Sequence, residues 1–117
     1  MTRLVLDTSA YSHFQRGHGE VIARIDAASW IGVPVVTIGE LGSGFRAGNR
    51  IDANLSLLER FLGSRVVDVI SIDRYVAEVY SEIVNALRRA GTPLPTNDIW
   101  IAACAAASGG TVLTFDE

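Results

Sequence analysis

Short apolar runs alternate along this chain with longer stretches in which apolar residues recur every three or four positions. Short runs rich in valine are typical of strands that are buried on both faces of a sheet. We expect such strands in RLVLD at 3–7, VPVVT at 33–37, RVVDVIS at 65–71 and GTVLTF at 110–115. Helical spacing predicts helices within 18–29, 38–48, 50–63, 73–91 and 96–110.

The order of these elements determines the expected fold class. Strands that alternate with helices predict an α/β domain with a central parallel sheet of four strands and helices on both faces. A length of 117 residues suits one domain with one hydrophobic core. No linker or internal repeat interrupts the pattern, so we expect a single domain over 1–117.

Composition excludes several classes of protein. Apolar residues make up 49% of the chain, but no apolar run approaches the roughly 18 residues of a membrane span, and the N-terminus lacks the apolar stretch of a signal peptide. We therefore expect a cytoplasmic protein with no membrane partner. All ten basic residues are arginine, which excludes a catalytic lysine. The net charge of −3 does not by itself indicate a nucleic-acid binder.

Four acidic residues occupy related positions in this pattern. Asp7 ends the first expected strand, Glu40 comes three residues after the second, in the first turn or two of the next helix, and Asp116 follows the fourth. Asp98 lies in the first turn of the helix that leads into the fourth strand. Carboxyl ends of parallel strands line one crevice, so we expect all four acids to converge there. Taken singly, Asp7, Asp98 and Asp116 also have ordinary explanations as a helix cap, a helix-start charge and a turn residue.

Four carboxylates at one edge of a sheet would repel one another strongly unless a cation neutralised them. Oxygen ligands without histidine or cysteine suit Mg²⁺, with Mn²⁺ as a substitute. Such ions activate water and stabilise charge on phosphate esters. The sequence therefore indicates a metal site for phosphate chemistry.

Short polar residues flank the acids. Thr8, Asn97 and Thr114 are expected to orient carboxylates or metal-bound water, although capping and local turn bonds are the alternative for such residues. For Ser9 we expect the two roles equally. Arg46 lies six residues after Glu40 and is the arginine that we expect nearest the site, as a contact for phosphate or a partner.

The segments that carry these acids resemble a known family. LDTSAY at the N-terminus, VTIGELGSGF with Glu40, PTNDIWIAA with Asp98 and LTFDE with Asp116 are similar to the signature blocks of PIN-domain ribonucleases. The closest resemblance is to the VapC-type toxins of type II toxin–antitoxin systems, and it runs in order through the whole chain.

This resemblance implies a PIN-like three-layer α/β/α fold and a metal-dependent endoribonuclease. Such an enzyme cuts structured RNA such as tRNA or rRNA, leaves 5′-phosphate and 3′-hydroxyl ends, and inhibits translation. By position, Asp7 and Asp98 would be the principal metal ligands, Glu40 and Asp116 would complete the site, and Thr114 would support it. The implied partners are RNA, a cognate VapB-type antitoxin whose C-terminal segment blocks the cleft, and a second copy in a homodimer.

One departure from the family pattern lies at the C-terminus. Similar proteins continue past the FDE block through a helical turn and a fifth strand, so we expect this PIN domain to be truncated there, with the fifth strand missing.

Two rival functions differ from a nuclease. A phosphatase or receiver domain would need a second acid near Asp7 or a lysine, and neither is present. A PIN-like module that has lost catalysis and only binds RNA or protein is the remaining alternative, and the presence of all four acids argues against it.

Overall fold

The computed structural model describes residues 1–115 and contains a four-stranded sheet with six helices. The strands are β1 (Arg3–Leu6), β2 (Trp30–Pro34), β3 (Val67–Ile70) and β4 (Thr111–Leu113). The helices are α1 (Thr8–Gln15), α2 (Gly19–Ala27), α3 (Val35–Arg46), α4 (Ile51–Leu62), α5 (Arg74–Ala90) and α6 (Thr96–Ser108). The four-stranded α/β arrangement expected from the sequence is confirmed.

The sheet is entirely parallel, in the order β3-β2-β1-β4. Leu4 of β1 pairs with Ile31 of β2 on one side and with Thr111 of β4 on the other. β1 and β2 are the inner strands, and other elements cover both of their faces. This explains their nearly continuous apolar sequences. The structure therefore places the end of β1 in the middle of the sheet.

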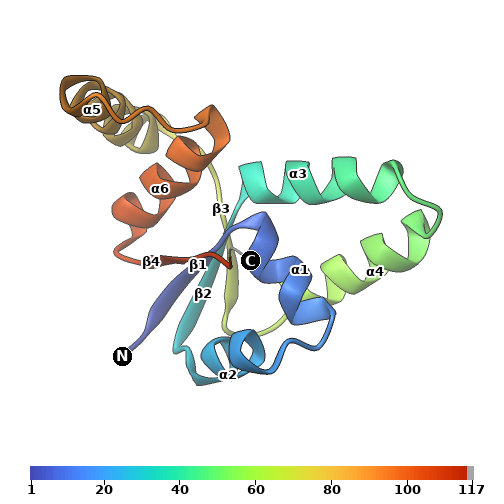
Figure 1. Ribbon diagram of the computed structural model, residues 1–117. Coiled ribbons are helices and arrows are strands. Elements are labelled where there is room, and N and C mark those ends of the chain that lie inside the picture. Colours follow the sequence, from blue (N-terminus) through green and yellow to red (C-terminus); the bar gives the residue numbers. More distant parts are fainter. Residues whose placement is uncertain (116–117) are drawn as a thin grey trace.

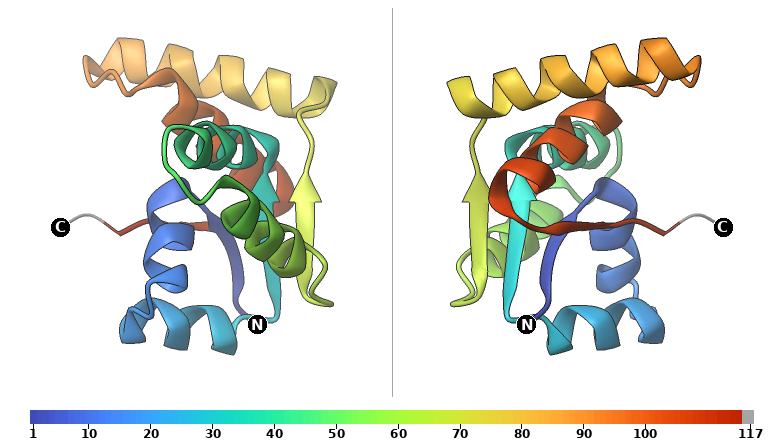
Figure 2. Two further views of the ribbon diagram at one scale, coloured as in Figure 1. Left: turned by 90° about the vertical axis from the view of Figure 1, so that its right-hand side faces the viewer. Right: turned by 90° about the vertical axis from the view of Figure 1, so that its left-hand side faces the viewer.

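Helices cover both faces of the sheet (Figure 1). Leu4 and Leu6 face α1 and α2, where they pack with Ala10, Val21 and Ile25. Val5, between them in sequence, points to the opposite face and packs against α6, as the alternation of side chains along a strand requires. Figure 2 shows α5 lying across the outer side of α6, away from the sheet. These layers form an α/β/α arrangement.

The second strand differs from its prediction. The expected strand at 33–37 is wrong in its bounds, because β2 covers Trp30–Pro34 and α3 begins at Val35. Tertiary pairing decides this boundary, since Trp30 is in register with Arg3 and Pro34 with Ile70. This context overrides the strand preference of the Val-Val-Thr run that opens α3. Thr37 instead donates a buried hydrogen bond of 3.0 Å to the carbonyl oxygen of Leu6.

The helix α1 was not among the elements expected from periodicity. It begins directly after Asp7, and buries Ala10, Tyr11 and His13. Tyr11 packs with Leu41 of α3 and Leu58 of α4, so α1 joins the sheet to this second helical pair. Within residues 1–115, no helix is long and apolar enough to span a membrane.

Candidate active site

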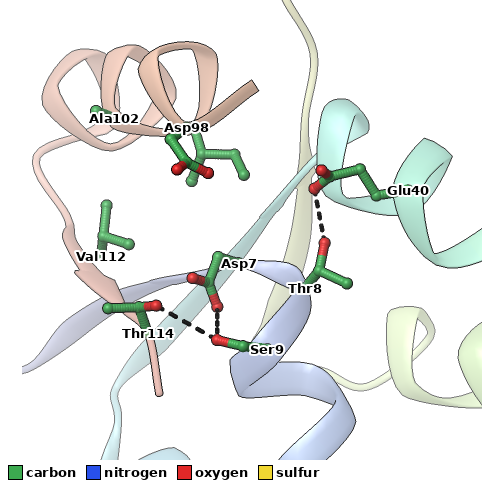
Figure 3. A pocket seen from close by; sticks show the side chains of 9 residues that line it. Asp7, Thr8, Ser9, Glu40, Asp98, Ala102, Val112 and Thr114 are labelled. Carbon is green, nitrogen blue, oxygen red and sulfur yellow. Dashed lines mark hydrogen bonds between the residues drawn. The ribbon is translucent and has the colours of Figure 1, made fainter. Parts of the chain in front are cut away.

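A cleft of about 500 Å³ opens at the carboxyl ends of β1 and β4, beside the first turn of α6. We call it the acidic cleft. Its lining comprises Asp7, Thr8, Ser9, Glu40, Asp98, Ile101, Ala102, Val112 and Thr114. Three of the four acids expected to converge thus lie around one cleft, although they come from three separate segments (Figure 3). The fourth, Asp116, lies outside the described residues.

Asp7 caps a helix and also lines the acidic cleft. It is the N-cap of α1, and its Oδ1 accepts hydrogen bonds from the backbone N–H of Ala10 at 2.9 Å and from Ser9 Oγ at 2.8 Å. Its own backbone N–H donates to the Leu113 carbonyl at 3.4 Å, which extends the contact between β1 and β4. These bonds hold one carboxylate oxygen, while Oδ2 has no hydrogen-bond partner within residues 1–115.

Glu40 is held from two sides. Thr8 Oγ1 donates to its Oε1 at 2.7 Å, and Asn97 Nδ2 donates to its Oε2 at 3.2 Å. These donors lie on α1 and α6, whereas Glu40 lies in the second turn of α3. In both hydrogen bonds the Glu40 oxygens are acceptors. One carboxylate therefore connects the three helices that surround the acidic cleft.

Asp98 is the most exposed of the three acids. It lies in the first turn of α6, where the positive end of the helix favours a negative charge. In the part of the chain that the structure describes, its carboxylate makes no hydrogen bond or ion pair. Ile101 and Ala102, three and four residues later on the same helix face, form an apolar wall of the cleft.

Val112 and Thr114 line the opposite side of the cleft. They are two residues apart, so an extended chain points both side chains the same way. Sequence reasoning missed the apolar residues of the cleft, Val112 on this side and Ile101 and Ala102 on α6. Their spacing from Thr114 and from Asp98 is the signal that identifies them.

The donors in the acidic cleft have the chemistry of a site for a hard cation. Carboxylate and hydroxyl oxygens line it, and none of its lining residues is histidine or cysteine. Two unit charges 4 Å apart repel by about 4 kcal/mol at an effective dielectric constant of about 20, so a cation would relieve the repulsion among the three acids. Among residues 1–115, however, no three His, Cys, Asp or Glu side chains form a group that could hold a metal ion.

Arg46 does not line the acidic cleft. It is exposed at the end of α3, and its guanidinium donates at 3.1 Å to the Gly42 carbonyl of its own helix. Six residues advance a helix by about 9 Å and turn it by about 240°, so Arg46 points away from the face that carries Glu40. Its expected contact with RNA or a partner stays a prediction.

Comparisons with known proteins agree with this fold and site. The PIN domain family matches residues 4–117. Ribonuclease VapC4 of Mycobacterium tuberculosis is 38% identical over 94 residues, which cover 80% of this chain and 72% of that protein. Plasmid stability protein StbB of Pseudomonas syringae pv. tomato is 33% identical over 121 residues, which cover 97% of this chain and 87% of that protein.

A solved structure has the same fold. VapBC2 from Rickettsia felis, bound to a DNA fragment from its promoter, superposes with a TM-score of 0.86, and the match covers 98% of this chain and 89% of that chain. Its sequence identity of 21% means that this likeness concerns the fold alone. The expected PIN-like architecture is thereby confirmed. With the family match and the relatives above, this chain is a member of the PIN-domain family and of its VapC-type branch.

Proposed function

We propose that this protein is an endoribonuclease toxin that hydrolyses RNA phosphodiester bonds with Mg²⁺, or Mn²⁺ in its place, bound at the acidic cleft. One observation supports this most directly: Asp7, Glu40 and Asp98 surround a single cleft in a VapC-type chain. The relative VapC4 is named a ribonuclease, and a cleft lined by carboxylates matches that chemistry.

The carboxylates themselves require a cation for this reaction. A phosphodiester is negatively charged, and three ionised acids would repel it from the cleft. Asp7 Oδ2 and both oxygens of Asp98 lack hydrogen-bond partners within residues 1–115, so they are the oxygens we assign to the ion. Glu40 and Asp116 complete the proposed site, Glu40 with both oxygens already held by Thr8 and Asn97.

When bound, such an ion lowers the pKa of a coordinated water and neutralises charge on the phosphate. The chain supplies the geometry: Thr8 and Asn97 fix Glu40, and the α1 cap fixes Asp7. Water attacks phosphorus, the bond from phosphorus to the 3′ oxygen breaks, and the products carry a 5′-phosphate and a 3′-hydroxyl. Ile101 and Ala102 on one side of the cleft, and Val112 on the other, limit the bulk water around the reacting phosphate.

The biological setting follows from the same family. We propose structured RNA, either tRNA or rRNA, as the substrate, with inhibition of translation as the outcome in the cytoplasm. The R. felis relative was solved as VapBC2, and we propose that a VapB-type antitoxin neutralises this chain by covering the acidic cleft. Arg46, exposed at the end of α3, is a proposed contact for RNA or for that antitoxin.

A second copy of the chain is a further proposed partner. The long helix α5 contacts α6 and buries only Val76. A hollow of about 520 Å³ lies along this helix, and its lining includes Val79, Ile83 and Ala86. Figure 2 shows this helix at the edge of the molecule, so a homodimer that covers it would bury apolar area that the monomer leaves open.

Cleavage of RNA tests the proposed activity against the alternative of an inactive binding module. The protein, purified free of any antitoxin, is incubated with total RNA in Mg²⁺, in Mn²⁺ or in excess EDTA. We expect cleavage only with metal, and a loss of about 100-fold or more in Asp98→Asn, which corresponds to about 2.7 kcal/mol of transition-state stabilisation. Asp52→Asn is the matched control, since Asp52 is also an exposed acid in the first turn of a helix, on α4.

Two results would favour the alternative. RNA binding without cleavage in either metal would indicate a binding module. Equal cleavage by Asp98→Asn and the Asp52→Asn control would remove the acidic cleft from the reaction.

A further inference from the structure

Ser9 lies where α1 meets the segment that follows β4. Its hydroxyl oxygen is 2.8 Å from Asp7 Oδ1, 2.9 Å from the backbone nitrogen of Phe115 and 3.3 Å from Thr114 Oγ1. Thr114 and Phe115 are 105 and 106 residues away in sequence. One hydroxyl therefore contacts both an acid of the cleft and the far end of the chain (Figure 3).

The protons of this group can be assigned from its partners. A serine hydroxyl has one proton to donate and two lone pairs to accept. Asp7 Oδ1, as a carboxylate oxygen, accepts the Ser9 proton. The Phe115 N–H donates to one lone pair of Ser9 Oγ. The contact with Thr114 then requires the Thr114 hydroxyl to donate to the other, so the capacity of Ser9 is completely used.

The hydrogen bonds of Ser9 all donate in the same direction, toward Asp7. Thr114 donates to Ser9, and Ser9 donates to Asp7, so the hydroxyl of Ser9 is polarised toward the carboxylate by its two donors. Thr114 Oγ1 keeps its own lone pairs, and Thr114 lines the acidic cleft. Loss of the Ser9 hydroxyl would change the hydrogen bonding of Asp7, Thr114 and Phe115 together.

We propose that Ser9 is a positioning residue that ties the segment after β4 to Asp7. A single hydroxyl would thereby set the orientation of the Asp7 carboxylate relative to the C-terminal side of the acidic cleft. The next residue in sequence after Phe115 is Asp116, the fourth proposed acid. The catalytic consequence rests on the proposed nuclease function, whereas the tie itself does not.

The segment depends on such a tie because β4 is short. β4 has three residues and pairs with β1 alone among the described strands. After Leu113, the backbone N–H of Phe115 donates its hydrogen bond to a side chain, the hydroxyl oxygen of Ser9. The ring of Phe115 also packs 4.4 Å from the rings of both His13 and His18. His13 lies on α1, where its Nδ1 is 2.7 Å from the Ser9 carbonyl oxygen, whereas His18 is the N-cap of α2.

The experiment compares the wild type with Ser9→Ala, Ser9→Thr and a matched control, Ser12→Ala, which makes the same change one turn along α1. Three quantities are measured on each protein. They are the exchange rate of the Phe115 amide hydrogen by NMR, the Mn²⁺ affinity by calorimetry, and kcat and KM for RNA cleavage.

For Ser9→Ala we expect Phe115 amide exchange to accelerate about 10-fold or more, because the acceptor of that N–H is lost. We expect Mn²⁺ affinity and kcat to fall by 10- to 100-fold, the usual effect of removing a partner of a metal ligand, with KM within about two-fold. Ser9→Thr keeps the hydroxyl and should restore all three quantities, and Ser12→Ala should match the wild type. If circular dichroism shows that Ser9→Ala does not fold, Ser9→Cys replaces it, since a thiol of similar size is only a weak donor and acceptor.

Different outcomes would refute the contact between Ser9 and Phe115 and the positioning role of Ser9. Unchanged Phe115 exchange in Ser9→Ala overturns the tie. If Phe115 exchange is faster in Ser9→Ala but Mn²⁺ affinity and kcat are unchanged, Ser9 makes a local turn contact and does not position Asp7. If the wild type binds Mn²⁺ but cleaves no RNA, the proposed nuclease has failed while exchange and affinity still decide the role of Ser9. A wild type that binds no Mn²⁺ overturns the positioning role together with the nuclease.

Discussion

Asp7 carries two roles that a pair of substitutions can separate. Its Oδ1 caps α1 by accepting from the Ala10 N–H at 2.9 Å, and its other oxygen is available to a cation. Asn caps helices about as well as Asp does, whereas Ala does not cap. Asp7→Asn should therefore keep the cap and lose the charge, while Asp7→Ala loses both.

The expected magnitudes follow from these contacts. Both variants lose one charge near the positive end of α1, worth about 0.3–1 kcal/mol, and both relieve repulsion with Glu40 and Asp98. These effects cancel when the two variants are compared. What remains is the cap, worth about 1 kcal/mol with a range of roughly 0.5–2, and the hydrogen bond from Ser9, which Asn also accepts and Ala does not, worth about 1 kcal/mol. For a domain of this size, Asp7→Ala should melt about 6–12 °C below Asp7→Asn. Both should lose RNA cleavage by about 100-fold or more.

The assay combines thermal melting in EDTA with RNA cleavage in Mg²⁺. Asp73→Ala is the matched control, because Asp73 caps α5 through the same bond, from the Val76 N–H at 2.9 Å, and does not line the acidic cleft. This control should lose about 1 kcal/mol of stability and keep its cleavage rate. Equal melting of Asp7→Asn and Asp7→Ala would refute the capping argument, and wild-type cleavage by Asp7→Asn would refute the assignment of Asp7 to the metal.

Two further predictions concern α5 and the core. Ala86→Arg places a large charged side chain at the hollow on α5 and should convert the proposed homodimer to monomer in light scattering. Ala77→Arg, nine residues earlier and thus on the opposite side of the helix, should leave it dimeric; a wild type that is already monomeric would contradict the proposal. Burial and, to a smaller extent, the charge of Asp73 raise the pKa of the Cys104 thiol. The folded state thus holds this proton more tightly than the unfolded state, so the contribution to stability is complete below the unfolded thiol pKa of about 8.5 and is lost as pH rises through the higher folded pKa. Urea midpoints between pH 7 and 10 should fall more steeply for the wild type than for Cys104→Ala, and equal slopes would refute this.

The strand and helix pattern was predictable because it depends on local periodicity. The single apolar face of α5 and the buried sequence of β1 are visible in any short window of sequence. The bounds of β2 were not, since the Val-Val-Thr run at 35–37 prefers a strand locally but lies in α3. Pairing with β1 and β3 determines where β2 ends, and a local window contains neither strand.

The acids of the cleft were found from topology, yet their hydrogen bonds were not. That Asp7, Glu40 and Asp98 would meet follows from the parallel order of the strands. The bonds of Glu40 to Thr8 and Asn97 span 32 and 57 residues, and the contact of Ser9 with Phe115 spans 106. No spacing along the sequence encodes such pairs, because they depend on how the helices pack over the sheet.

Asp7 and Asp73 are two helix-capping acids with similar local sequence positions, but only Asp7 lines the acidic cleft. Each comes shortly after a strand, and each caps the following helix with a hydrogen bond of the same length. The sequence by itself predicted the helix after Asp73, whereas for Asp7 it offered a helix cap only as one explanation of the acid, although capping depends in both cases on the three residues that follow. Only the tertiary structure decided that Asp7 lines the acidic cleft, since β1 lies inside the sheet next to β4, whereas β3, which precedes Asp73, lies at its edge.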